Sequence, residues 1–86
     1  MPRYITMHTL ACLTRQGAEE LARRLHAAEG VSVRRVLVNM QEGKMLVEFE
    51  AESREALEKW LTNERFHSDW LLRVELESTG GPLAPV

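Results

Sequence analysis

Two apolar, β-branched segments separated by a short turn constrain the fold of this 86-residue chain more than any other feature. Both lie within Val31–Ala51, and Gln41-Glu42-Gly43 joins them. Alternating apolar and polar residues are typical of half-buried strands, and a glycine in a short loop between two such runs is typical of a hairpin turn. The segment therefore predicts a β-hairpin against which the rest of the chain must pack.

One strand and one helix are predicted on each side of this hairpin. Arg3–Leu10 and Trp70–Glu77 alternate with a period of two, whereas Arg15–Glu29 repeats apolar residues at helical spacing. A second helix is expected to begin after Ser53, whose hydroxyl can cap its first turn. The order β-α-β-β-α-β favours a ferredoxin-like α+β sandwich. In that sandwich the four strands form an antiparallel sheet, the first strand lies between the third and the fourth, and both helices cover one face.

Alternation also assigns the strand residues to the two faces of the sheet. The face beneath the helices is expected to carry Ile5, Met7, Val36, Val38, Val47, Phe49, Leu72 and Val74. The open face is expected to carry Tyr4, Thr6, His8, Arg35, Leu37, Leu46, Glu48, Arg73 and Glu75. The second set is more apolar than a solvated face needs, and its charges would need partners if buried. Small domains of this architecture often pair sheet to sheet, so we expect a homodimer.

Composition limits the domain organisation, the partners and the compartment. The length fits one small domain, which we place at residues 1–77, followed by a flexible tail at 78–86 that has two Gly and two Pro and no periodicity. A net charge of −2 argues against a nucleic-acid partner. No apolar run is long enough to span a bilayer, and Cys12 has no second cysteine to pair with. We therefore expect a cytoplasmic protein without a membrane partner.

His8 is the main candidate for chemistry, because the predicted register places it among polar residues in the middle of the sheet. It could act as a general base oriented by Glu48, or it could bind a divalent metal together with Glu48. It could equally be a structural histidine that is hydrogen-bonded across strands. The candidate ligand-binding residues are Tyr4, Thr6, His8, Arg35, Leu46, Glu48 and Arg73, and the candidate metal ligands are His8 and Glu48. His67 and Asp69 form a second pair that could bind a metal or a substrate.

With its strands placed, the chain resembles a group of small bacterial ferredoxin-like proteins, some of them described as nickel-binding. The matching features are a first strand from Met1-Pro2 to His8-Thr9, a helix that begins at Thr14, Arg35-Val36 and Gly43-Lys44 in the hairpin, and Ser53 with Glu55-Ala56 at the second helix. The resemblance implies a ferredoxin-like fold, a dimer of the α+β barrel type, and His8 as the metal-site position. The third predicted strand, Met45–Glu48, departs from the group because it has no cysteine.

Three functional hypotheses follow from these features. The first is a homodimeric module that binds a small molecule or a metal ion, such as nickel, on the open face around His8. The second is a small cofactor-free enzyme of the isomerase or monooxygenase kind, with His8 as its acid or base. The third is an interaction domain whose sheet face is only a dimer interface. The sequence leaves open whether the protein is an enzyme.

Overall fold

The computed structural model describes all 86 residues and confirms an α+β fold with two helices and a four-stranded antiparallel sheet. The main elements are β1 (Arg3–Thr9), α1 (Arg15–His26), β2 (Ser32–Asn39), β3 (Lys44–Glu50), α2 (Arg54–Asn63) and β4 (Trp70–Val74). Helix α1 ends before the predicted Glu29. The predicted last strand breaks at Glu75, and the chain then forms a separate hairpin of β5 (Leu76–Glu77) and β6 (Ala84–Pro85).

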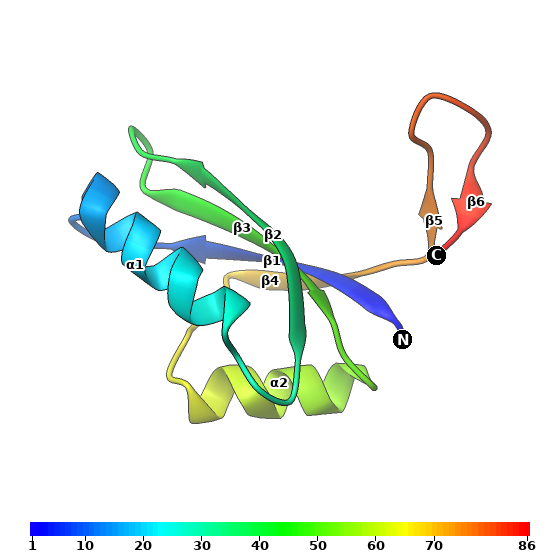
Figure 1. Ribbon diagram of the computed structural model, residues 1–86, viewed down its shortest axis with the longest axis horizontal. Helices are drawn as coiled ribbons and strands as arrows, with labels where there is room; N and C mark the ends of the chain where they lie inside the picture. Colours follow the sequence, from blue (N-terminus) through cyan, green and yellow to red (C-terminus); the bar gives the residue numbers. More distant parts are fainter.

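The sheet has the strand order β2-β3-β1-β4, so β1 lies between β3 and β4 as predicted. Each neighbouring pair is antiparallel. Figure 1 shows α1 and α2 lying along the sheet, while the β5–β6 hairpin stands away from both helices. One core joins Leu25 of α1 and Leu57 and Leu61 of α2 to a single face of the sheet. Both helices therefore cover the same face, and no element of the chain covers the other.

Local sequence explains where the two helices begin. The hydroxyl of Thr14 accepts a hydrogen bond from the backbone N–H of Gly17 at 3.0 Å, and Ser53 does the same for Ala56 at 3.1 Å. Such side-chain caps satisfy N–H groups that the first turn of a helix leaves without partners. The predicted caps at Thr14 and Ser53 are confirmed.

The hairpin between β2 and β3 forms as predicted, and it is closed by Gly43. This glycine has φ of +65°, and its carbonyl accepts a 2.8 Å hydrogen bond from the N–H of Leu10. A Cβ atom added at Gly43 would lie 2.8 Å from the Leu10 carbonyl oxygen. The turn therefore needs glycine both for its backbone angle and for the close approach of the loop after β1.

The prediction of which residues face the helices is correct for β2 and β3. On β3, Met45, Val47 and Phe49 are fully buried beneath the helices. Their partners on β2, Val36 and Val38, lie on the same side. The open side carries Arg35, Leu37, Leu46 and Glu48, as expected from the alternation.

The same prediction is wrong for β1 and β4. On β1 the residues beneath the helices are Tyr4, Thr6 and His8, because they pair with Phe49, Val47 and Met45 of β3. On β4 the inward residue is Leu71, which pairs with Thr6 and packs on the core. The predicted inward residues of these two strands instead lie on the open face, and they are Ile5, Met7, Leu72 and Val74. A shift of one residue exchanges the two sides of a strand, and alternation alone does not say which side meets the core.

Candidate functional site

The structure divides the predicted site residues between the two faces of the sheet. Tyr4, Thr6 and His8 are buried beneath the helices, with exposed fractions of 2%, 0% and 0%. Arg73 pairs with Tyr4, so it belongs to the same side of the sheet, although it is exposed at the edge strand β4. The remaining predicted residues lie on the open face, and they are Arg35, Leu46 and Glu48. The sheet itself separates the two sets, so the predicted single pocket does not form.

Both ring nitrogens of His8 are engaged inside the protein. Its Nδ1 lies 2.7 Å from the carbonyl oxygen of His67, and its Nε2 lies 2.6 Å from the hydroxyl of Thr6. A carbonyl oxygen only accepts hydrogen bonds, so Nδ1 carries the proton of the neutral ring. Nε2 then accepts the hydroxyl hydrogen of Thr6. This tautomer leaves His8 no free lone pair for a metal ion.

The imidazole of His8 is also held by stacking and by burial. Its ring lies 3.7 Å from that of Phe66, centroid to centroid, and the two planes are 6° from parallel. Burial lowers the pKa of His8 below 6.5, although the hydrogen bond to His67 and the charge of Asp69 act in the opposite direction. The ring is therefore neutral at pH 7. Of the three readings that the sequence left open, the structure matches the structural histidine.

Glu48 lies on the opposite side of the sheet from His8, where it is surrounded by arginines. Its carboxylate accepts a 2.8 Å hydrogen bond from Nε of Arg35, and it lies 3.5 Å from Arg34 and 3.7 Å from Arg3. Only 10% of the Glu48 side chain is exposed, and these cations compensate its burial. The predicted metal pair of His8 and Glu48, and the predicted acid–base pair of the same residues, are therefore wrong.

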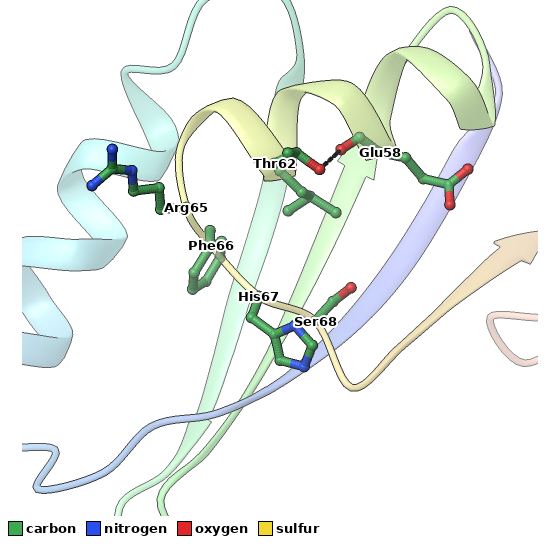
Figure 2. A pocket seen from close by; sticks show the side chains of 7 residues that line it. Glu58, Thr62, Arg65, Phe66, His67 and Ser68 are labelled. Carbon is green, nitrogen blue, oxygen red and sulfur yellow. Dashed lines mark hydrogen bonds between the residues drawn. The ribbon is translucent and has the colours of Figure 1, made fainter.

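The loop between α2 and β4 forms a surface hollow of about 370 Å³, shown in Figure 2. Its lining residues are Glu58, Leu61, Thr62, Arg65, Phe66, His67 and Ser68. The side chain of His67 is 88% exposed and lies 3.9 Å from Asp69. Ser68 makes no hydrogen bond with His67, so the arrangement of an activated serine is not formed.

The open face is more apolar than the sequence interpretation expected, because β1 and β4 add apolar residues to it. It gathers Ile5, Met7, Leu37, Leu46, Trp70, Leu72 and Val74 from all four strands. Leu37, Trp70 and Leu72 are 49%, 44% and 58% exposed. Of the apolar residues on this face, the sequence interpretation had assigned only Leu37 and Leu46 to it.

The polar part of the open face lies at one end, where an ionic cluster forms around Glu48. Three arginines and three glutamates take part, and these are Arg3, Arg34, Arg35, Glu48, Glu50 and Glu77. Hydrogen bonding to Arg34 lowers the pKa of Glu50, so that carboxylate is charged at neutral pH. The cluster as a whole has no net charge.

The chain was compared with protein-family models, with curated proteins and with solved structures, and none of the three comparisons gave a match. The resemblance to small ferredoxin-like proteins therefore stays a prediction. No three side chains of histidine, cysteine, aspartate or glutamate converge closely enough to hold a metal ion. Neither helix has the length and apolar character needed to cross a bilayer.

Proposed function

We propose that this chain is a ferredoxin-like domain that forms a homodimer through the open face of its sheet. The strand order β2-β3-β1-β4, with both helices on one face, supports the ferredoxin-like assignment. The observation that carries the dimer is the apolar open face. An antiparallel sheet that faces water carries mostly polar side chains on that side, whereas this face presents Leu37, Trp70 and Leu72 to solvent.

The accessible surface of the single chain supports the same proposal. It amounts to 6053 Å² for a mass of 9.9 kDa. A folded monomer of that mass exposes about 5,200 Å², so the chain exposes an excess of about 850 Å². A specific interface of standard size removes about 800 Å² from each partner. The excess is of the same size as the area that one partner of a standard dimer buries, and the exposed residues 75–86 contribute to it.

Charge favours a second copy of this chain as the occupant of the open face. In a two-fold dimer the same patch meets itself, so the patch must be self-complementary. Apolar side chains meet this condition. The ionic cluster meets it as well, because its three positive and three negative side chains balance and can exchange partners across the interface.

Sedimentation equilibrium of the wild type and of single lysine variants tests the dimer. We expect the wild type to sediment at twice 9.9 kDa. Leu37→Lys and Leu72→Lys should each sediment as monomers, because an interface must desolvate the introduced ammonium group without a partner for it.

Met40→Lys is the matched control. Met40 is 40% exposed, but it lies beside α1 rather than on the open face, so this variant should remain a dimer. A monomeric wild type across micromolar concentrations would overturn the proposal. If the Leu37→Lys and Leu72→Lys variants remained dimeric, the dimer interface would have to lie outside the open face, which would also overturn the proposal.

A hollow at one end of the open face supports a second candidate function, the binding of a small amphipathic molecule. The hollow measures about 370 Å³, and its apolar lining includes Met7, Leu37 and Leu46. Its charged lining residues are Lys44 and Glu42, and the ammonium group of Lys44 can pair with the anionic group of an otherwise apolar molecule. Titration with decanoate, followed by the fluorescence of Trp70 on the same face, should saturate, and Lys44→Ala should weaken binding about tenfold or more. A titration that does not saturate at millimolar decanoate would exclude this candidate.

A further inference from the structure

The C-terminal arm, residues 75–86, forms a β-hairpin that exposes apolar side chains. Strand β5 pairs with β6, and the N–H of Val86 donates a 3.1 Å hydrogen bond to the carbonyl of Glu75. Ser78 donates to the carbonyl of Gly81 inside the loop. Leu76, Leu83 and Val86 are nevertheless 52%, 66% and 42% exposed.

The arm contacts its own domain through polar groups. Its Glu77 accepts a 2.8 Å hydrogen bond from Arg3, whereas Leu76, Leu83 and Val86 do not pack on the core. Figure 1 shows the hairpin projecting away from α1 and α2 at the end of the sheet. Three exposed apolar side chains on a hairpin that does not use them within its own chain indicate that they contact something else.

The position of the arm identifies that contact. Glu77 and Thr79 line a hollow of about 270 Å³ together with Arg34, Arg35 and Glu48. Arg35 and Glu48 belong to the open face, so the arm rises on the side of the sheet that the helices leave uncovered. A second copy seated on the open face would lie beside the arm.

We infer that the arm of each copy packs against the second copy and clasps the dimer, with Leu76, Leu83 and Val86 as its apolar contacts. This inference rests on the proposed dimer. It adds a second contact region that is continuous with the open face, because Glu77 joins the arm to the ionic cluster through Arg3. By two-fold symmetry each copy gives one arm and receives one.

Removal of residues 78–86 tests the clasp, since it deletes Leu83 and Val86 but leaves the bond between Arg3 and Glu77 possible. We expect the dimer dissociation constant to rise about a hundredfold or more, because the two arms of a dimer together lose four aliphatic side chains, Leu83 and Val86 from each copy. Leu83→Ser/Val86→Ser, which keeps the chain length, should weaken the dimer in the same direction. Thr79→Ser is the matched control on the same arm and should leave the dissociation constant unchanged.

Hydrogen exchange of the amides of Leu83, Ala84 and Val86 supplies a second readout. These amides should be protected in the wild-type dimer and should lose protection in the monomeric Leu72→Lys variant, although that substitution lies outside the arm. Equal exchange in both would mean that the hairpin's own hydrogen bonds account for the protection and that the second copy does not contact the arm, and it would overturn the inference.

The remaining outcomes separate the clasp from the proposed function. A truncated chain that dimerises as tightly as the wild type would overturn the clasp and leave the open-face dimer standing. A truncated chain that dimerises more tightly would show that the arm shields the open face of its own chain, and it would also overturn the clasp. A wild type that is monomeric at all concentrations would overturn both.

Discussion

His8→Phe tests the conclusion that His8 is a neutral, structural side chain. Phenylalanine keeps a ring that can stack on Phe66, but it removes both hydrogen bonds of the imidazole. The hydroxyl of Thr6 and the carbonyl of His67 then lose their partners in a buried region. Each unsatisfied buried group costs about 1–3 kcal/mol, so the two together should lower the free energy of unfolding by about 2–6 kcal/mol.

That loss is large for a domain of this size, because 86 residues correspond to a total stability of about 4–13 kcal/mol. Urea denaturation followed by circular dichroism at pH 7.5, at one fixed protein concentration, measures it. Thr6→Val in the His8→Phe background should recover about 1 kcal/mol or more, since it removes one of the two orphaned groups. The exposed His26 gives the matched control, because His26→Gln should change stability by less than about 0.5 kcal/mol.

The pH dependence of the same variants tests the protonation state. Burial lowers the folded-state pKa of His8, so below about pH 6.5 the unfolded chain binds more protons than the folded one. The contribution of His8 to stability is complete above pH 6.5 and declines as the pH falls toward the folded-state pKa. His8→Phe lacks this decline, so its difference from the wild type should narrow between pH 7.5 and pH 5.5. A constant or widening difference would refute the buried neutral ring, as would a variant as stable as the wild type at pH 7.5.

Substitutions at three further positions test the fold by urea denaturation. Gly43→Ala should cost more than about 1 kcal/mol, because φ is +65° and the new Cβ would meet the Leu10 carbonyl oxygen; an unchanged midpoint would contradict this turn geometry. Ser53→Ala should cost about 1 kcal/mol through loss of the α2 cap, and Ser53→Gly should cost less than Ser53→Ala. Leu57→Ala, at a fully buried core position, should cost about 2–5 kcal/mol, and a loss below 1 kcal/mol would show that α2 does not pack as described.

The structure moves the candidate interaction surface of this protein from His8 to the open face of the sheet. The sequence directed attention to His8, which is buried and hydrogen-bonded at both nitrogens. The surface left uncovered instead combines an apolar centre with a neutral ionic cluster around Glu48. Such a surface is suited to association with a second copy, and the exposed arm adds to the same side of the sheet.

The sequence by itself determined the six main elements and their order, but not the β5–β6 hairpin. The correct predictions rest on local signals. These are the hairpin turn at Gly43, the caps at Thr14 and Ser53, and the alternation of β2 and β3, and each depends on residues that are close together in the chain. Local signals of this kind can be interpreted without knowledge of the tertiary structure. They were enough to predict an antiparallel sheet with β1 in its centre and both helices on one face.

Only the tertiary structure decided which side of β1 and β4 meets the core. Hydropathy favoured Ile5 and Met7 as the buried residues of β1, but the structure buries Thr6 and His8 in their place. It can do so because Thr6, His8 and the distant carbonyl of His67 satisfy one another, which removes the cost of burying polar groups. A partner 59 residues away in the chain leaves no mark in the local pattern. That exchange of sides separated His8 from Glu48 and left the apolar residues of β1 and β4 on the open face.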